Sequence, residues 1–410
     1  IKGSNACSEK IMFPDSTCIL SSINVRKFSS SPKVYKEELN VIGESIVRFL
    51  DNVVEYEIVH KRAPYPEQLE ITSQLREIGC GITNLHGWLF DQGHGYDSDK
   101  GIKRAEDFIK HYSYVCWKTS MELGKEKGNC EAFNSAAVTC SGFVSRMMGE
   151  FPDLEFRTLR NSQVMSFAPA GTLSLMFQKP VISTGIEPCP GFYYWKRTRA
   201  SGSWVWYFVV PGFVREYLEN KGIKLPFEGD NIEDNSGQIG EKCQRIIEKN
   251  LEPGFFKAAH QIDPLKKVEL MGRFAKWVDS GMSVTYNIPE ESTYKTVESI
   301  YVEGWKQGVK SIAVYRDKSR RGVIEFDPPP VVEKRFQDKE ETNGKPEAIE
   351  QHRAPRRPQF LPCNVYHVKV QGKKFIVIVG ILDGRPYEVF AGEQNEIEIP
   401  RSIKYGVVER

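Results

Sequence analysis

Residues 4–25 read SNACSEKIMFPDSTCILSSINV, and this stretch carries the first pattern that bears on the fold. Asn5, Cys7 and Glu9 follow one another at every second position. In an extended segment, side chains at positions i, i+2 and i+4 share one face. An extended backbone here would therefore present an amide, a thiol and a carboxylate to the same space. After a turn at Pro14, the β-branched residues that end the stretch predict a strand.

Helical and strand-like patterns alternate along the chain as far as residue 315. Helices are expected over residues 35–57, 65–79, 96–128 and the later part of 287–308. Strands are expected within residues 11–25 and over 162–168, 203–210 and 309–315. Asp97 or Ser98 is expected to cap the third of these helices at its N-terminus. The alternation predicts an α/β fold.

The composition excludes several classes of partner. The 56 basic and 54 acidic residues give a net charge of +2, which provides no electrostatic argument for nucleic acid or an anionic membrane as a partner. No apolar run reaches the roughly 18 residues of a membrane span. The chain does not begin with Met. We therefore expect a fragment, a spliced product or the second half of a split protein.

The nine cysteines are odd in number and contain no CxxC pair. Zinc-binding spacing and a compact disulfide framework are both absent from the sequence, and no histidine pair has the spacing of metal ligands. We therefore expect a reducing, cytoplasmic location and no metal site. Most of the cysteines are expected to be small buried residues, and His86 to be a core residue whose polar atoms are satisfied.

The composition changes after residue 325. Residues 326–361 contain three consecutive prolines, runs of charge and few large apolar residues, which predicts a flexible linker. Three short strand patterns separated by glycine-containing turns follow it. The predicted organisation is thus an α/β body over 1–325, a linker over 326–361 and a small β-rich module over 362–410.

A second informative stretch, SQVMSFAPAGTLS, covers residues 162–174. Here a strand runs into a loop that lets backbone amides and hydroxyls approach a ligand, an arrangement by which proteins hold phosphate without much positive charge. An ordinary strand-to-helix turn is the alternative interpretation. The candidate phosphate-binding residues are Ala168, Pro169, Ala170, Gly171, Thr172 and Ser174.

Together these motifs resemble the ribonucleotide reductases. The Asn-x-Cys-x-Glu pattern, followed eleven residues later by Cys18, resembles their finger loop, and SFAPAGTLSL with STGIEP resembles their substrate-phosphate loop. LREIGCGITNLHGWLFDQGHGYDS and DSGMSVTYNIPEESTYKTVESIYVEGWKQGVKSIAVYRDKSR extend the resemblance to about residue 325. The tail LPCNVYHVKVQGKKFIVIVGILDGRPYEVFAG resembles the C-terminal extension of the class II, coenzyme-B12-dependent branch.

The resemblance implies a fold. The family forms a ten-stranded α/β barrel of two five-stranded halves, with the finger loop threading its centre. This chain then corresponds to the finger loop and the second half of the barrel, followed by the β-rich module. The first half is expected upstream as a separate partner, without which the chain is inactive.

The resemblance also implies a reaction, the reduction of ribonucleotides to 2′-deoxyribonucleotides through a thiyl radical. A radical at Cys7 would take the 3′-hydrogen of the ribose, Glu9 would act as base on the 3′-hydroxyl, and Asn5 would hold the sugar. Cys18 would form a disulfide with a cysteine of the missing half as water leaves. The enzyme would be of the ribonucleoside-diphosphate reductase type.

The segment GVKSIAVYR bears on the source of the radical. Class I enzymes carry adjacent tyrosines here, whereas this chain has Ala313 and Val314. Aliphatic residues cannot relay an electron and a proton, which favours adenosylcobalamin as cofactor. Two alternatives are a class I large subunit and a non-catalytic nucleotide-binding half-barrel. The expected partners are a ribonucleotide, a thioredoxin-like or other dithiol reductant, and a second copy in a homodimer.

Overall fold

In a computed structural model, the protein divides into two compact units, unit 1 (Ile1–Glu333) and unit 2 (Lys334–Arg410). The structure describes residues 3–174, 182–200, 203–229, 231–234, 236–252, 255–317, 319, 324–325, 357–370, 373–394 and 399–409. The predicted linker lies outside the described residues from 326 to 356. Each unit is described by itself.

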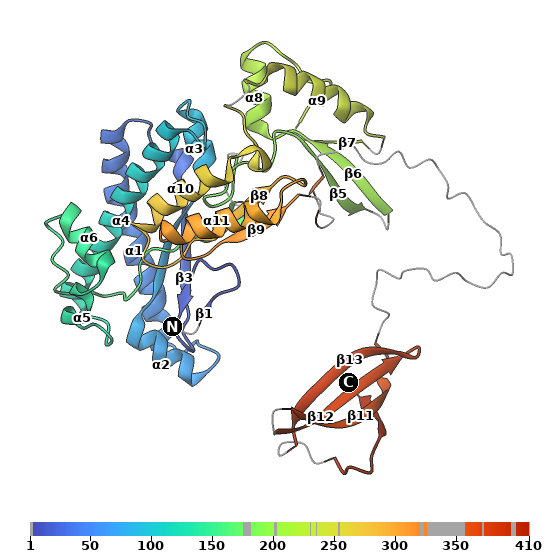
Figure 1. The fold of residues 1–410 in the computed structure, drawn as a ribbon. Coiled ribbons are helices and arrows are strands. Elements are labelled where there is room, and N and C mark those ends of the chain that lie inside the picture. The colour runs from blue at the N-terminus through green and yellow to red at the C-terminus, as the bar shows by residue number, and fades with distance from the viewer. Residues whose placement is uncertain are drawn as a thin grey trace. The chain divides into compact units, whose positions relative to one another are not determined.

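Unit 1 is built on parallel strands that follow one another in chain order (Figure 1). β3 (Ile19–Asn24) pairs in parallel with β4 (Ile78–Thr83). An extended segment over residues 163–168 adds beside β4, because Cys80 N donates to Val164 O at 2.8 Å and Cys80 bridges Met165 in parallel. β4 is therefore an interior strand of the sheet.

The sheet continues on the other side of residues 163–168. Phe167 bridges Met282 in parallel, and Ser283 N donates to Phe167 O at 2.8 Å. The segment that contains Met282 leads into β8 (Thr285–Ile288), which pairs in parallel with β9 (Ala313–Arg316). Five parallel extended segments thus lie side by side, as expected for one half of an α/β barrel.

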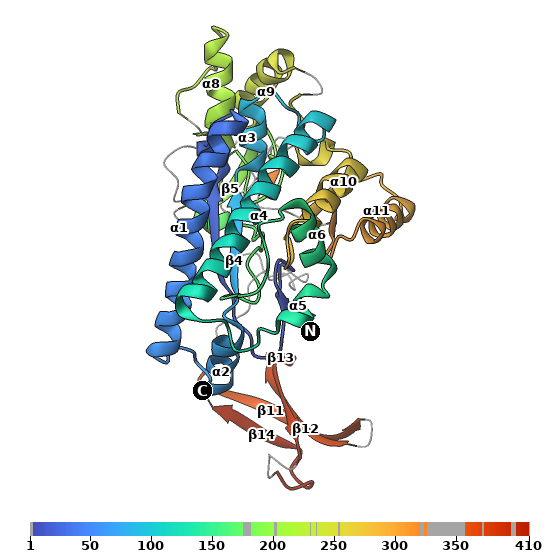
Figure 2. The ribbon, with the colours of Figure 1, turned by 90° about the vertical axis from the view of Figure 1, so that its left-hand side faces the viewer.

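Helices form the connections between these strands. α1 (Pro32–Val59) and α2 (Pro66–Leu75) link β3 to β4, and α3 (Leu85–Asp91), α4 (Asp99–Lys127), α5 (Ser135–Thr139) and α6 (Gly142–Glu150) lead from β4 to residue 163. α10 (Pro264–Ala275) precedes β8, and α11 (Tyr294–Lys306) links β8 to β9. Figure 2 shows α1 and α4 lying over β4, and their apolar sides form the main core of unit 1.

A cluster of buried charges lies where α1 meets the C-terminal ends of α2 and α4. Asp51 of α1 is fully buried, and Arg76 Nη2 donates to its carboxylate at 2.8 Å. Arg160 and Lys127 lie 3.2 and 3.4 Å from the same carboxylate. Burial raises the pKa of Asp51, but these three cations outweigh it and leave the pKa below its usual range. The cluster joins α1, the end of α2 and the end of α4.

Residues between 168 and α10, together with a short strand that follows β9, form a second part of unit 1. It contains the four-residue α7 (Gly171–Ser174), an antiparallel sheet and two helices, α8 (Gly212–Asn220) and α9 (Gln238–Asn250). The sheet has the order β10 (Ile324–Glu325), β5 (Tyr194–Ala200), β6 (Ser203–Val209) and β7 (Asn231–Glu233). Its own core packs Trp195 and Phe208 against α9, where Gly240 leaves room for the indole ring.

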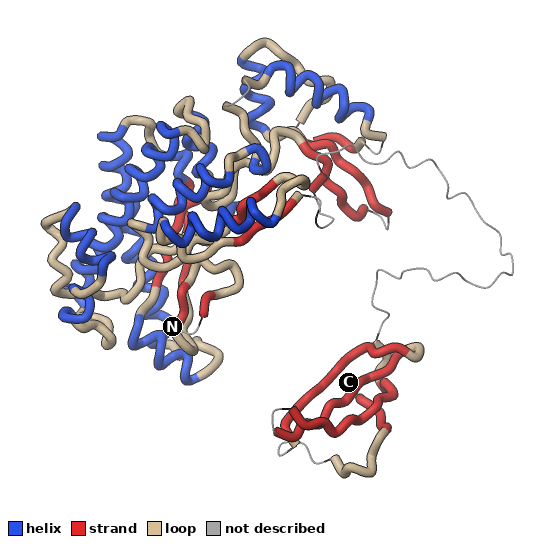
Figure 3. Tube along the Cα trace, in the orientation of Figure 1, coloured by secondary structure: helices blue, strands red, loops and turns tan. Residues whose placement is uncertain are grey.

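The described part of unit 2 consists of strands and loops (Figure 3). β11 (Phe360–Val370), β12 (Lys373–Leu382), β13 (Arg385–Glu393) and β14 (Tyr405–Glu409) form an antiparallel sheet in the order β13-β12-β11-β14. Leu361, Cys363, Val365 and Ile376 are buried on one face of the sheet. The predicted β-rich part is thus present, with one strand more than the sequence indicated.

Several elements differ from the sequence-based expectations. The helix expected over 65–79 ends at Leu75, because Arg76 adopts a left-handed φ of 48°, and β4 begins at Ile78. β4 reads IGCGIT and is buried at every position, so it lacks the alternation by which strands are recognised. β5 was also not predicted. Ser98, not Asp97, caps α4 by accepting from Gly101 N at 3.0 Å.

Within the described residues, no helix is both long and apolar enough to cross a membrane.

Candidate active site

The first described residues form a β-hairpin. β1 (Gly3–Ser4) pairs antiparallel with β2 (Ile11–Met12), and residues 5–10 form the tip. Asn5 N donates to Lys10 O at 3.1 Å, and Ser8 N donates to Asn5 O at 3.0 Å. The backbone over residues 5–9 is therefore a turn, and the condition under which Asn5, Cys7 and Glu9 would share one face is not met. Ser8, with a φ of 63°, reverses the chain at the tip.

The tip gives its three candidate residues different environments. Cys7 is exposed, Asn5 is half-buried and Glu9 is 3% exposed. Asn5 Oδ1 accepts from Lys10 N at 3.1 Å and so helps to close the loop. Glu9 Oε2 is buried without a hydrogen-bond partner among the described residues. The hairpin therefore holds an open thiol beside a shielded carboxylate.

The hairpin is anchored across the parallel strands. Gly281 N and Ser166 Oγ both donate to Glu9 O, at 2.8 and 2.7 Å. Ser311 Oγ donates to Ser8 O at 3.3 Å. At the base of the tip, Ile11 N donates to Ser280 Oγ at 3.2 Å and Gln163 Nε2 donates to Ile11 O at 3.1 Å. The hairpin is thus contacted by residues 163–168, by the segment that leads into β8, and by Ser311 just before β9.

These anchors lie on the face of the sheet away from α1 and α4. Met165 and Phe167 belong to the helix-side core, and Ser166 between them points to the opposite face. Figure 1 shows the hairpin on that side of β3. Gly281 is required here, since a Cβ atom would lie 2.3 Å from Ser8 O. The sequence analysis did not identify these anchors, although Gly281 lies in the DSGMS motif that carried part of the resemblance.

Cys18 lies immediately before β3 and is half-buried. Burial raises the pKa of its thiol to about 12; Lys10 lowers this pKa and Glu77 raises it. A Cβ on Gly79 would lie 3.3 Å from Cys18 Sγ, so the glycine of β4 lets the thiol pack against the strand. The structure therefore brings Cys18 to the base of the hairpin, next to Lys10.

The predicted phosphate loop follows the third extended segment at the carboxyl edge of the sheet. Ala170 has a left-handed φ of 53°, and α7 begins at Gly171. A second segment packs against it, because a Cβ on Gly185 would lie 2.8 Å from Ala168 O. Thr83, the last residue of β4, accepts from Gly185 N at 3.0 Å. Ligands in open α/β sheets bind at this carboxyl edge.

The members of this loop are not equivalent. A Cβ on Gly171 would meet no atom of the described residues within 4 Å, so its backbone is open with respect to that part of the chain. Ser174 is buried, and its hydroxyl lies 2.9 Å from that of Thr83, which makes it part of the loop's own hydrogen bonding. The side chain of Thr172 lies outside the described residues.

His86 is a core residue, as expected. Its Nδ1 accepts from Cys189 N at 2.9 Å, and burial lowers its pKa to about 4. All nine cysteines lie among the described residues as free thiols.

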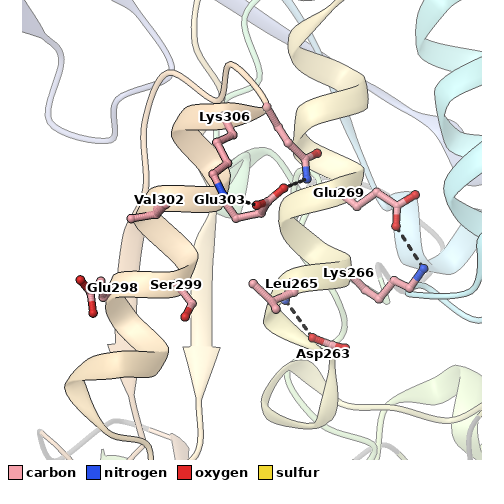
Figure 4. Close-up of a pocket in the computed structure, with 10 residues that line it drawn as sticks. Asp263, Leu265, Lys266, Glu269, Glu298, Ser299, Val302, Glu303 and Lys306 are labelled. Atoms are coloured by element: carbon pink, nitrogen blue, oxygen red, sulfur yellow. Dashed lines mark hydrogen bonds and ion pairs between the residues drawn. The ribbon is translucent and has the colours of Figure 1, made fainter.

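A surface pocket of about 690 Å³ lies between α10 and α11 (Figure 4). Four of its charged side chains form two ion pairs: Lys266 with Glu269 at 3.1 Å, and Lys306 with Glu303 at 3.7 Å. Neither the hairpin nor the predicted phosphate loop contributes to its lining. We therefore place the candidate active site at the hairpin.

Comparison with known proteins gives the family. The profile of the ribonucleotide reductase barrel domain matches residues 1–315. The chain belongs to the ribonucleotide reductase family. A second profile, that of the NrdJ homologue C-terminal domain, matches residues 361–410. The predicted ribonucleotide reductase family and α/β fold are thereby confirmed.

Relatives of this ribonucleotide reductase chain include two vitamin B12-dependent enzymes. The vitamin B12-dependent ribonucleoside-diphosphate reductase of Mycobacterium tuberculosis is 29% identical over 324 residues, which cover 79% of this chain and 42% of the relative. The vitamin B12-dependent ribonucleotide reductase of Streptomyces coelicolor is 26% identical over 360 residues, covering 78% and 36%. The chain thus spans less than half the length of these curated relatives.

A solved structure supports the fold. The class Id ribonucleotide reductase alpha subunit of Actinobacillus ureae matches with a TM-score of 0.57 at 21% identity, covering 77% of this chain and 53% of that subunit. At this level of identity the match supports the fold of unit 1 and says nothing about its chemistry.

Proposed function

We propose that this chain supplies the finger loop and the second half of the catalytic barrel of an adenosylcobalamin-dependent ribonucleotide reductase. The observation that carries the proposal is the hairpin tip. It presents an exposed Cys7 next to a buried Glu9 and is pinned to the sheet by Gly281 and Ser166. A binding module for nucleotides has no need for a thiol held in this way.

In the proposed reaction, Cys7 is the group that abstracts the 3′-hydrogen of the ribose. Glu9 accepts the proton of the 3′-hydroxyl, a role suited to a carboxylate oxygen that has no other partner among the described residues. Asn5 uses Oδ1 to close the hairpin, so its Nδ2 is the atom left to donate to the sugar. Cys7 thus serves hydrogen abstraction, Glu9 serves deprotonation, and Asn5 positions the sugar.

Cys18 is proposed to supply electrons together with a cysteine of the first half of the barrel. The two thiols would form a disulfide as the 2′-hydroxyl leaves as water, and an external dithiol of the thioredoxin type would then reduce that disulfide. The position of Cys18 at the base of the hairpin supports this role.

The backbone around Gly171 is proposed to hold the substrate phosphate. Ser166 anchors the hairpin, and Ala168 begins the loop two residues later on the same extended segment. At about 3.3 Å per residue, the loop begins roughly 7 Å from the anchor. One nucleotide could therefore reach both the hairpin and the loop. Ribonucleoside diphosphates are the proposed substrates, in keeping with the name of the Mycobacterium tuberculosis relative.

Adenosylcobalamin, when bound, would supply the one-electron chemistry that oxidises the Cys7 thiol. The exposed thiol fits this role, since no described residue covers it. The sequence of β9 favours adenosylcobalamin over the radical-relay mechanism of class I enzymes. Val314 packs on the core and Ala313 precedes it, so this pair offers no aromatic relay. The names of the bacterial relatives support the same cofactor.

The proposal includes three partners and a compartment. The first half of the barrel completes the site, a dithiol reductant restores it, and a second copy of the completed enzyme forms a homodimer. The free state of all nine cysteines supports a reducing compartment such as the cytoplasm.

The proposal is tested by combining the chain with a polypeptide that carries the first half of the barrel. The mixture receives adenosylcobalamin, a ribonucleoside diphosphate and a dithiol, and deoxyribonucleotide is measured by chromatography. We expect product from the mixture and none from the 410-residue chain alone. Product from the chain alone would contradict the need for a partner, and a complete mixture that yields none would contradict the reductase assignment.

A further inference from the structure

A buried ion pair lies directly behind the proposed catalytic tip. Lys10 follows Glu9 in the hairpin, and Glu77 precedes β4. Lys10 Nζ lies 3.8 Å from Glu77 Oε2, and both side chains are 1% exposed. Neither the ammonium nor the Glu77 carboxylate has a hydrogen-bond partner among the described residues. A buried pair without supporting hydrogen bonds is a poor source of stability, so a reason for retaining it must be sought in what lies beside it.

The neighbour of this pair is Cys18. Ile19 of β3 is paired with Ile78 of β4, so the same parallel register sets Cys18 opposite Glu77. The charge of Lys10 acts on the Cys18 thiol and lowers the pKa that burial raises. The described residues therefore form a compact group of one thiol, one ammonium and one carboxylate on the hairpin side of the sheet.

Apart from Lys10, the ionisable groups that act on Cys18 or Glu77 are carboxyl and thiol groups, and Lys310 acts on Asp279, which lies beside them. Cys80 of β4 raises the pKa of Cys18 slightly, and Asp279, which precedes Gly281, raises the pKa of Glu77. Ser16 contributes a hydroxyl beside Glu77. Lys10 is accordingly the cation that acts on the Cys18 sulfur, and each of the other ionisable groups in the cluster acts against a negative charge there.

We propose that Lys10 is a positioning residue that stabilises the thiolate of Cys18 against the opposing charge of the Glu77 carboxylate, with which Lys10 is paired. The inference rests on the proposed function, in which Cys18 is one of the two reducing cysteines. It adds a residue to the reduction half of the reaction, while Asn5, Cys7 and Glu9 serve the radical half.

The step concerned is the recovery of the oxidised enzyme. A thiolate of the external dithiol attacks the partner sulfur of the Cys18 disulfide, the S–S bond breaks, and its electron pair leaves on Cys18 as a thiolate. The second thiol of the reductant then displaces the mixed disulfide, which leaves the reductant oxidised and both enzyme cysteines reduced. A low-dielectric site resists the charge on Cys18, and the adjacent ammonium offsets it.

The test follows the alkylation of Cys18 in the 410-residue chain at pH 9 with iodoacetamide, read peptide by peptide by mass spectrometry. Cys140, exposed after α5, is the internal reference for reagent and pH, and buried Cys189 must stay unmodified to show that the variant is folded. Thiolate is the reacting form, so each unit of pKa changes the rate about tenfold.

Lys10→Met is expected to slow Cys18 roughly tenfold, because an uncharged side chain of similar length replaces the ammonium. Lys10→Arg keeps the charge and should stay within a few-fold of the wild type. Glu77→Gln should accelerate Cys18, since it removes the opposing carboxylate. The two neutralising variants are thus expected to have opposite effects.

A merely structural role predicts a different result. If the pair only held the hairpin in place, Lys10→Met and Glu77→Gln would both loosen it and both accelerate Cys18. That outcome, or an unchanged rate in Lys10→Met, would overturn the proposal. Should Lys10→Met fail to fold, Lys10→Gln, which is also uncharged, takes its place: slower alkylation of Cys18 supports the proposal, and an unchanged or faster rate overturns it.

The test is independent of the reductase assay. Opposite shifts in alkylation, combined with an inactive completed enzyme, would support the coupling of Lys10 to Cys18 and overturn ribonucleotide reduction. Normal turnover of the completed enzyme, combined with unchanged alkylation in Lys10→Met, would overturn the coupling and leave the reductase proposal standing.

Discussion

The backbone N–H of Gly281 donates to the carbonyl oxygen of Glu9 over 2.8 Å, and a Cβ on Gly281 would lie 2.3 Å from the carbonyl oxygen of Ser8. This contact joins the start of the chain to a strand formed more than 270 residues later. It holds the carboxylate residue of the hairpin by its backbone and leaves the side chain free for chemistry. The position of Cys7 over the sheet depends on it.

Gly281→Ala should displace the hairpin tip. The new methyl group overlaps Ser8 O, so the tip must move or the strand must shift, at a cost of about 1–3 kcal/mol in the free energy of unfolding. We expect deoxyribonucleotide formation by the completed enzyme to fall by more than tenfold, with stability measured in parallel by urea denaturation. Gly142→Ala is the matched control, because a Cβ there meets nothing within 4 Å. Equal activity in the two variants would contradict the anchoring role.

Cys7→Ser and Cys18→Ser should fail at different steps. A serine hydroxyl holds its hydrogen far more tightly than a thiol, so Cys7→Ser should show neither turnover nor substrate-dependent cofactor cleavage. Cys18→Ser retains Cys7 and should begin the reaction, but it lacks an electron donor and should release free base from the sugar. Each variant is completed with the first half of the barrel, and free base, cofactor cleavage and deoxyribonucleotide are followed together.

The control for this pair is Cys140→Ser, an exposed thiol at the end of α5 that should have wild-type turnover. Sustained deoxyribonucleotide formation by Cys18→Ser would remove Cys18 from the mechanism. The same result for Cys7→Ser would remove the radical assignment altogether.

Gly171→Val should weaken substrate binding without weakening the fold. A Cβ on Gly171 meets no described atom within 4 Å, so the added side chain is expected to occupy the proposed phosphate position. The loss of several charge-assisted hydrogen bonds should cost a few kcal/mol, which raises the dissociation constant about 100-fold or more. Equilibrium binding of a ribonucleoside diphosphate to the completed enzyme measures this, with Gly142→Val as control. An unchanged dissociation constant would show that the phosphate binds elsewhere.

His86 should make stability depend on pH between about 6.5 and 4. Its folded pKa of about 4 lies below the unfolded value, so its neutral form contributes stability that is complete above pH 6.5 and is lost as the pH falls toward 4. The shift corresponds to a loss on the order of 3 kcal/mol. Urea unfolding of the wild type and of His86→Gln over this pH range isolates the contribution of His86 to the free energy of unfolding.

The variant is expected to lose less stability than the wild type as the pH falls, because Gln cannot be protonated. His60→Gln, at the exposed C-terminal cap of α1, should follow the wild-type curve. Parallel curves for the wild type and His86→Gln would show that His86 is not held neutral by burial.

Much of the fold could be predicted from local patterns. α1, α4 and α11 have long apolar periodicities, so their positions followed from the spacing of Leu, Ile and Phe residues. β4 could not be predicted, because IGCGIT is buried on both faces and contains two glycines. Its strand character comes from pairing with β3 and with residues 163–168 on either side. Only neighbours remote in sequence supply that pairing.

The candidate site, like the fold, could be predicted from the sequence only in part. The sequence by itself determined which chemical groups are present, because Asn5, Cys7, Glu9 and Cys18 form an ordered set of a kind that is characteristic of a family. The tertiary structure decided how they are held. Asn5 and Ser8 close a turn, which the spacing of the residues does not reveal, and Gly281 fastens that turn to the sheet.

Lys10 shows why the sequence reveals the identity of a side chain but not its environment. In the sequence it is one of many lysines, and its neighbours give no sign that it is buried. Its charge becomes significant when the hairpin folds onto the sheet and brings Glu77 and Cys18 within reach of it. The strength of an electrostatic interaction depends on distance and on the exclusion of water. Side-chain identity is therefore recorded in the sequence, whereas the environment that sets its chemistry is created by contacts between segments far apart along the chain.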